Sequence, residues 1–178
     1  MKKILVVVDM QNDFVDASLG SKDAIAIVEN VVNKINTWEG EIVVTRDTHT
    51  KDYLNTREGK FLPVEHCIKG TDGWELNPKV TKALENKHAY FIDKPTFGST
   101  ELVELVKEIA KKDEVEVELI GLCTDICVVS NAMLLKAYYP EMNIYVDAKC
   151  CAGVSKESHD AALMTMKSCQ IEILNDGE

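Results

Sequence analysis

The fold is decided by the stretch Ile4-Leu5-Val6-Val7-Val8-Asp9, in which five consecutive apolar residues end in a carboxylate. Such a run is typical of a strand inside a parallel sheet, because helices cover both faces of that sheet. Similar runs recur, and the predicted strands are Lys3–Asp9, Glu41–Arg46, His88–Asp93, Val115–Leu122, Asn143–Asp147 and Gln170–Leu174. Helical patterns separate them at Lys22–Trp38, Asn77–Glu85, Thr100–Lys112, Asp125–Tyr139 and Lys156–Ser168.

This alternation of strands and helices predicts the α/β class. Helical connections between parallel strands cross over in the right-handed sense, which produces a doubly wound sheet. We expect a three-layer αβα sandwich around a mainly parallel, six-stranded, Rossmann-like sheet, formed by residues 1–178 as one domain. The polar segment Asp47–Trp74 is long for a connection inside a compact domain, and this length indicates a functional loop.

Charge and cysteine usage restrict the class of protein. The formal net charge of -10 argues against a nucleic-acid or anionic-membrane surface, because both attract clustered lysine and arginine. The apolar run that follows Lys3 is too short for a signal peptide or a membrane span. The six cysteines include no C-x-x-C pair, so we expect free thiols and a cytoplasmic location.

Reactive side chains follow four of the predicted strands. Asp9 ends the first strand, Asp47 and His49 follow the second, Lys94 follows the third, and two cysteines follow the fourth. In an open parallel sheet, ligands bind beyond the carboxyl ends of the strands. The sequence therefore predicts an active site at this edge of the sheet.

The two cysteines, Cys123 and Cys127, lie where a buried strand ends and a helix begins. Unpaired N–H groups at a helix start favour an anion, so a thiol there is expected to ionise more readily and to act as a nucleophile. Asp9 is a candidate general base, and Lys94 would lower the pKa of a neighbouring thiol. On these grounds alone, the choice between the two cysteines stays open.

The long loop carries a candidate metal site. The Asp47-x-His49 pair places two ligands on one side of an extended segment, and Glu58 and His66 follow on the same loop. Oxygen and imidazole ligands suit Zn, with Fe or Mn as alternatives. Asp52 and Glu65 are further candidate ligands.

Three segments together resemble the signature segments of the isochorismatase-like cysteine hydrolases. They are Val6-Val7-Val8-Asp9-Met10-Gln11-Asn12-Asp13-Phe14, Lys94-Pro95-Thr96-Phe97 and Gly121-Leu122-Cys123-Thr124-Asp125-Ile126-Cys127-Val128. Within that superfamily, the segment His66-Cys67-Ile68-Lys69-Gly70-Thr71-Asp72-Gly73 and the Asp47-x-His49 loop are similar to those of nicotinamidases.

The resemblance implies a catalytic triad of Asp9, Lys94 and Cys127. It selects Cys127 because the family's nucleophile follows Thr-Asp-x. It places a cis peptide bond at Cys123, so that the backbone N–H groups of Cys123 and Cys127 form the oxyanion hole. It also assigns Phe14 and Phe97 to the walls of the substrate pocket.

The resemblance further implies a divalent metal, with zinc as the first choice, held by Asp47, His49, Glu58 and His66. Many relatives have a third histidine where this chain has Asn55, so Glu58 is expected to replace it. The family resemblance also implies a homo-oligomer.

The reaction implied is hydrolysis of nicotinamide to nicotinate and ammonia through a cysteine thioester, as part of NAD salvage. One alternative is hydrolysis of another small amide or of a ureido or carbamoyl compound. A phosphotransferase that uses Asp9 as nucleophile fits poorly, because Gln11 stands where a second carboxylate is usual. A non-catalytic scaffold would need neither the triad nor the loop ligands.

Overall fold

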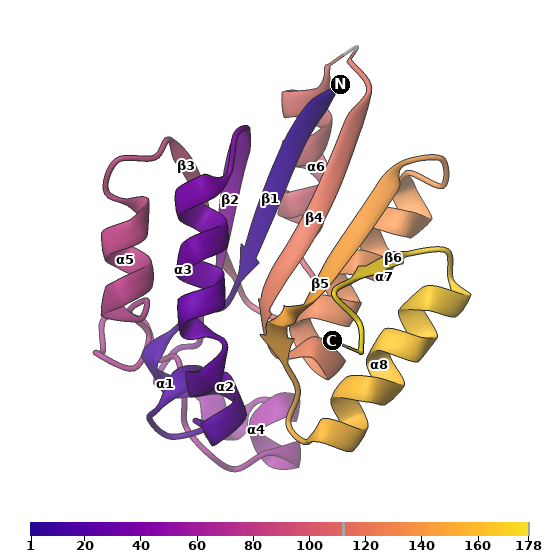
Figure 1. The fold of residues 1–178 in the computed structure, drawn as a ribbon. Helices are drawn as coiled ribbons and strands as arrows, with labels where there is room; N and C mark the ends of the chain where they lie inside the picture. The colour runs from indigo at the N-terminus through magenta and orange to yellow at the C-terminus, as the bar shows by residue number, and fades with distance from the viewer. Residues whose placement is uncertain (112, 178) are drawn as a thin grey trace.

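The computed structural model describes residues 1–111 and 113–177, which form a six-stranded sheet between two layers of helices (Figure 1). The strand order is β3-β2-β1-β4-β5-β6, and each neighbouring pair is parallel. The strands are β1 (Lys2–Val8), β2 (Glu41–Asp47), β3 (Ala89–Lys94), β4 (Val115–Leu122), β5 (Asn143–Ala152) and β6 (Glu172–Leu174). The predicted three-layer, doubly wound sandwich is confirmed.

The central strand β1 explains why the sheet is buried on both sides. Its side chains alternate between two cores, with Ile4, Val6 and Val8 in one and Leu5 and Val7 in the other, and all five are fully buried. Each such side chain stabilises the fold by about 1.5–3 kcal/mol relative to an exposed one. The continuous apolar run is therefore the pattern that two covering layers of helices require.

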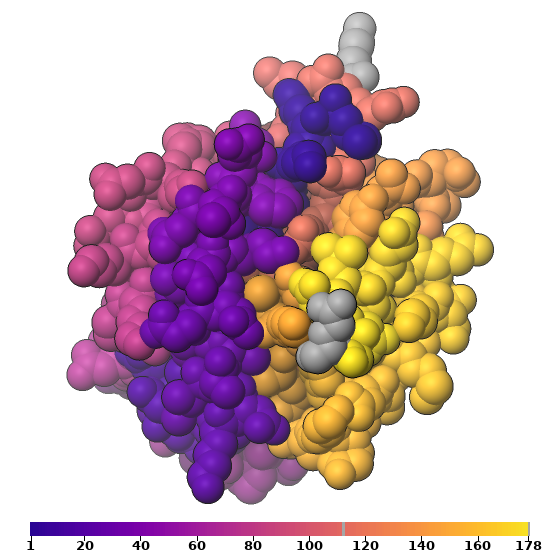
Figure 2. Space-filling model, in the orientation of Figure 1, coloured from indigo at the N-terminus to yellow at the C-terminus, as the bar shows by residue number. Residues whose placement is uncertain are grey.

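Two groups of helices cover the two faces. One group comprises α1 (Asn12–Val15), α2 (Lys22–Ala26), α3 (Val28–Thr37) and α5 (Pro78–Leu84). The other comprises α6 (Thr100–Ala110), α7 (Val129–Tyr138) and α8 (Lys156–Ser168). Segments distant in sequence lie side by side on the surface, where Figure 2 shows purple residues from the N-terminal part of the chain beside orange residues from its C-terminal part. One such contact is the 2.9 Å hydrogen bond from Asn30 Nδ2 to the carbonyl of Lys149.

The structure corrects several predicted boundaries. The helix expected over Lys22–Trp38 is divided at Ile27 into α2 and α3, and the strand expected to end at Asp147 continues to Ala152. The helix expected from Asp125 begins instead with a π-helical turn, η2 (Thr124–Val128). The long loop contains a 3-10 turn, η1 (Tyr53–Asn55), and a short helix, α4 (Arg57–Phe61).

Two predicted boundaries, the helix end at Lys112 and the domain end at Glu178, lie outside the described residues. Within the parts of the chain that are described, none of the helices combines the length and apolar character needed to cross a membrane.

Candidate active site and metal centre

Asp9, Lys94 and Cys127 meet beyond the carboxyl ends of β1, β3 and β4. Lys94 Nζ lies 2.6 Å from Asp9 Oδ2 and donates a 3.4 Å hydrogen bond to Cys127 Sγ. All three residues are at most 4% exposed. The structure thus brings together the three residues that the sequence singled out, in a contact that excludes bulk water.

The backbone at the strand ends makes this approach feasible. Asp9 has a φ of +48°, which turns the chain away from β1 directly after the last strand residue. Gly121 has a φ of +118°, and a Cβ at this position would lie 2.1 Å from the carbonyl oxygen of Val8. Glycine is therefore required for β4 to run close to β1 just before the cysteine turn.

Further hydrogen bonds fix the acid and the cation. Thr45 Oγ1 donates to Asp9 Oδ1 at 2.7 Å, and Lys94 Nζ donates to the carbonyl of Thr96 at 3.0 Å. Lys94 Nζ also lies 3.7 Å from Asp47 Oδ1. Lys94 therefore stands between the acid–thiol pair and the loop that carries the predicted metal ligands.

The electrostatics of the three groups correct one expectation. Burial raises the pKa of the Cys127 thiol well above its usual value, and the charge of Asp9 raises it further, while Lys94 opposes both effects. The thiol at rest is therefore protonated, contrary to the ready ionisation expected from its place near a helix start. Burial also raises the pKa of Asp9, against the opposing influence of Lys94, which makes this carboxylate a stronger base.

Lys94 keeps its charge although it is buried. Burial alone would lower its pKa, but Asp9, Cys127 and Asp47 together raise that pKa above the usual value for a lysine. A permanent cation at this point balances either a carboxylate or a thiolate beside it.

The turn after β4 places the two cysteines differently. The Leu122–Cys123 peptide bond is cis, and the carbonyl of Cys123 accepts hydrogen bonds from the N–H groups of Ile126 (3.1 Å) and Val128 (3.0 Å). Cys123 is partly exposed, and burial raises the pKa of its thiol to about 12. The structure places Cys127, not Cys123, within hydrogen-bonding distance of Lys94.

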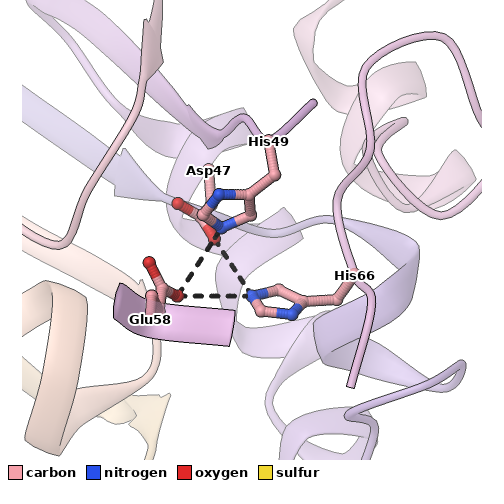
Figure 3. A group of neighbouring side chains, drawn as sticks. All are labelled: Asp47, His49, Glu58 and His66. Carbon is pink, nitrogen blue, oxygen red and sulfur yellow. Dashed lines mark hydrogen bonds and ion pairs between the residues drawn. The ribbon is translucent and has the colours of Figure 1, made fainter. Parts of the chain in front are cut away.

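Four side chains form a group that could hold a metal ion (Figure 3). They are Asp47, His49, Glu58 and His66, and their ligand atoms all lie within 4.8 Å of one another. Glu58 comes from α4 and points toward the two histidines, with Oε1 at 3.6 Å from His49 Nε2 and 3.7 Å from His66 Nε2. Asp47 Oδ2 lies 2.8 Å from His49 Nε2 and 3.4 Å from His66 Nε2.

The surroundings of this group fit a divalent cation. His66 Nδ1 is 2.8 Å from the carbonyl of Val64, a contact that leaves Nε2 free to face the other ligands, as metal-binding histidines usually do. Asp47 Oδ2 lies near both histidines, and the buried Asp47 Oδ1, which lies 3.7 Å from Lys94 Nζ, has no hydrogen-bond partner among the described residues. Two imidazoles and two carboxylates are a donor set suited to zinc, iron or manganese.

Glu58 is held in place by the packing of α4. Thr56 caps this helix, its hydroxyl accepting the N–H of Gly59 at 3.0 Å. A Cβ at Gly59 would lie 2.0 Å from the carbonyl oxygen of Tyr53, so this residue must be glycine for α4 to pack. Asn55, in place of which the sequence predicts Glu58 as a ligand, donates a hydrogen bond to Asp52 Oδ1 at 2.6 Å. The remaining candidates, Asp52 and Glu65, lie outside the group of four.

One cavity joins the two centres. It has a volume of about 510 Å³, and its lining includes Asp47, Glu58, His66, Cys123 and Cys127. The apolar part of its wall is formed by Phe14, Leu19, Ala24, Leu62, Phe97, Leu122, Ile126 and Val154. Both phenylalanines singled out from the sequence thus line this cavity. A shallower groove of about 580 Å³ over α8 contains none of the residues of the two centres.

Comparison with known proteins identifies the family. The model of the isochorismatase domain matches residues 3–176. The chain belongs to the isochorismatase family. Among its relatives, a nicotinamidase of Schizosaccharomyces pombe is 27% identical over 97% of this chain and 92% of its own length.

Solved structures of nicotinamidases and pyrazinamidases superpose over nearly the whole chain. The nicotinamidase/pyrazinamidase of Bacillus subtilis has a TM-score of 0.82 and 26% identity, covering 98% of this chain and 100% of that one. The pyrazinamidase of Pyrococcus horikoshii, solved in complex with zinc, has a TM-score of 0.80 and 26% identity, covering 98% and 99%.

Two residues that support the site of this isochorismatase-family protein escaped sequence reasoning. The Gln11 amide is fully buried and forms two hydrogen bonds with the backbone of Asp47. It accepts the Asp47 N–H at 2.7 Å and donates to the Asp47 carbonyl at 2.8 Å. His159 Nδ1 lies 2.7 Å from Thr124 Oγ1 in the cysteine turn. Gln11 lies only two residues after Asp9, and this nearness to a candidate catalytic residue could have pointed to it. No such signal exists for His159, because its position beside Thr124 depends on how α8 packs.

Proposed function

We propose that this protein hydrolyses nicotinamide to nicotinate and ammonia through a thioester on Cys127, as a step of NAD salvage. The observation that carries the proposal is that one cavity contains both Cys127, paired with Asp9 and Lys94, and three of the four metal-binding candidates. The named activity of the relatives, nicotinamidase, supports the choice of substrate. A cysteine with a buried base and cation is suited to covalent acyl transfer.

In the first half of the reaction, Asp9 accepts the proton of the Cys127 thiol as sulfur attacks the carboxamide carbon. The new C–S bond converts the carbonyl oxygen into an oxyanion, which the backbone N–H groups of Cys123 and Cys127 bind. Lys94 balances the negative charge throughout. The tetrahedral centre then breaks its C–N bond, and the proton on Asp9 passes to the departing nitrogen, which leaves as ammonia.

In the second half, Asp9 accepts a proton from a water molecule that attacks the thioester carbon. The C–S bond breaks, the proton on Asp9 returns to the Cys127 sulfur, and the released nicotinic acid gives its own proton to solvent to become nicotinate. The raised pKa values of Asp9 and of the thiol suit this exchange, because Lys94 contacts both groups between which the proton moves.

We assign the metal-binding role to Asp47, His49, Glu58 and His66, with zinc as the metal. When bound, the ion supplies a Lewis acid for the pyridine nitrogen. The apolar walls at Phe14 and Phe97 would enclose the ring, so that the carboxamide faces Cys127. The zinc complex of the Pyrococcus horikoshii pyrazinamidase supports this choice of metal.

Ammonia release from nicotinamide tests the proposal. The protein should release ammonia, a strong chelator should abolish the release, and added zinc should restore it. Cys127→Ala should release none. Full turnover by Cys127→Ala would reject the mechanism, and turnover of another small amide or ureido compound in place of nicotinamide would reject the substrate while leaving the cysteine chemistry intact.

We also propose that residues 1–178 act as one domain, in the cytoplasm and as a homo-oligomer. The match of one family model to residues 3–176 supports the first point, and the free cysteines support the second. The exposed apolar residues Leu54, Phe61 and Leu62, in η1 and at the end of α4, support the third. Light scattering of the purified protein would contradict the third point if it gave the mass of one chain.

A further inference from the structure

Asn131 is a fully buried residue of α7 that lies four positions after Cys127. Its side chain makes three hydrogen bonds. Nδ2 donates to the carbonyl of Cys127 at 2.8 Å and to the carbonyl of Phe97 at 3.1 Å, and Oδ1 accepts the N–H of Ser99 at 2.9 Å. Both amide protons and the amide oxygen are therefore used.

These bonds join two separate parts of the chain. Cys127 belongs to the turn after β4, whereas Phe97 and Ser99 belong to the connection between Lys94, at the end of β3, and α6. The bonds fix which way the amide faces, because only Oδ1 can accept the Ser99 N–H and only Nδ2 can donate to two carbonyls.

The connection that Asn131 holds is also the one that carries Lys94. Lys94 Nζ donates to the carbonyl of Thr96 at 3.0 Å, one residue before the carbonyl that Asn131 binds. The same Nζ lies 3.4 Å from Cys127 Sγ. Asn131 therefore closes a ring of contacts that runs from the sulfur through Lys94 and the connection back to the backbone of Cys127.

We propose that Asn131 is a positioning residue that sets the placement of Cys127 against Lys94 and of the Phe97 wall against both. Its bond to the Cys127 carbonyl orients the attacking sulfur, and its bonds to Phe97 and Ser99 hold the cavity wall. The inference rests on the proposed role of Cys127 as nucleophile. The physical basis is that a displacement of about 1 Å at a reacting group can reduce a rate by roughly 10²-fold.

Two substitutions separate the two halves of this role. Asn131→Ala removes all three bonds. Asn131→Thr retains one of them, because a threonine hydroxyl in a helix readily donates to the carbonyl four residues earlier, which is that of Cys127. The shorter side chain does not reach Phe97 or Ser99.

Tyr139→Phe is the matched control. It removes the 2.9 Å hydrogen bond from the Tyr139 hydroxyl to the carbonyl of Val103, a contact between the end of α7 and α6 that lies away from the cavity lining. It therefore removes a hydrogen bond between α6 and the C-terminal end of α7 without touching the nucleophile or the cavity wall.

We expect Asn131→Ala to lower kcat by about 10- to 100-fold and to raise KM for nicotinamide. Asn131→Thr should recover most of the loss in kcat while keeping the raised KM. Tyr139→Phe should match the wild type in both constants. Values of kcat and KM within roughly twofold of the wild type in both Asn131 variants, or an equal loss in Tyr139→Phe, would overturn the proposal.

A second measurement needs no substrate. The rate at which iodoacetamide labels the sulfur of Cys127, located by fragmentation of the peptide that also carries Cys123, should fall in Asn131→Ala, because the sulfur no longer faces Lys94. A labelling rate equal to or above that of the wild type would contradict the proposal. If Asn131→Ala does not fold, Asn131→Thr decides alone, and an unchanged KM overturns the inference. A wild-type protein inert toward nicotinamide would refute the proposed function but leave the labelling comparison decisive for Asn131.

Discussion

Replacing Lys94 with methionine removes the buried cation while retaining a long, unbranched side chain. In the wild type, Nζ lies 2.6 Å from Asp9 Oδ2 and 3.4 Å from Cys127 Sγ. The substitution therefore tests whether the charge of Lys94, rather than its volume, supports the reaction of the thiol.

The size of the effect follows from these distances. Two unit charges 3.4 Å apart attract by about 5 kcal/mol at an effective dielectric constant of about 20. Loss of that attraction for the thiolate corresponds to a rate reduction of roughly 10³-fold. A second effect also lowers the rate. Without the Lys94 cation, the already raised pKa of Asp9 rises further, so Asp9 holds a proton and cannot accept the one from the thiol. We expect kcat/KM to fall by at least about 10³-fold.

The assay is the steady-state hydrolysis of nicotinamide by zinc-loaded protein, with metal content measured in the same samples because Lys94 lies near Asp47. Lys34→Met is the matched control, since Lys34 pairs with Glu118 at 2.6 Å and Asp147 at 2.8 Å but does not line the cavity. It should lose stability and keep its kcat/KM. A folded, metal-loaded Lys94→Met variant with kcat/KM within about tenfold of the wild type would refute the electrostatic reasoning.

Two further predictions concern residues outside the triad. Gln11→Leu removes both hydrogen bonds to the Asp47 backbone, so zinc affinity measured by competition with a chromophoric chelator should fall by about 10- to 100-fold, and an unchanged affinity would contradict this role. Burial raises the pKa of Asp147, but hydrogen bonds from Asn175 and Lys34 lower it by more, so its net pKa is below the usual value. Its charged form therefore stabilises the fold above the unfolded-state pKa of about 3.9, and that contribution is lost as pH falls further through the folded-state pKa. Urea unfolding of wild type and Asp147→Asn should show a stability difference at neutral pH that shrinks below about pH 4, and a constant difference would contradict the assignment.

Much of the fold could be predicted because it depends on local pattern. The bounds of β4 and α8 agree with the sequence, since β4 is a mainly apolar, β-rich segment and α8 is a helical segment that Ser155 caps at its start. The convergence of Asp9, Lys94 and Cys127 follows from parallel strands alone, whose carboxyl ends share one edge of the sheet.

Features that depend on tertiary packing could not be predicted. The helix α4, which carries Glu58, has only five residues. This is too few to show a helical period, so the sequence did not predict a helix within the long loop. The pKa of Cys127 had the opposite direction to the one expected, because burial outweighs the influence of the helix start and of Lys94. The role of Asn131 depends on the Phe97 connection lying against α7, a contact that no local pattern encodes.

The central claim is that Cys127, and not Cys123, forms the covalent intermediate. Rapid acid quenching during turnover of nicotinamide, followed by peptide mass measurement, tests it directly. A nicotinoyl group should appear on the sulfur of Cys127 in the wild type and in Cys123→Ala, and no adduct should form in Cys127→Ala. An adduct on Cys123, or continued turnover by Cys127→Ala, would contradict the account.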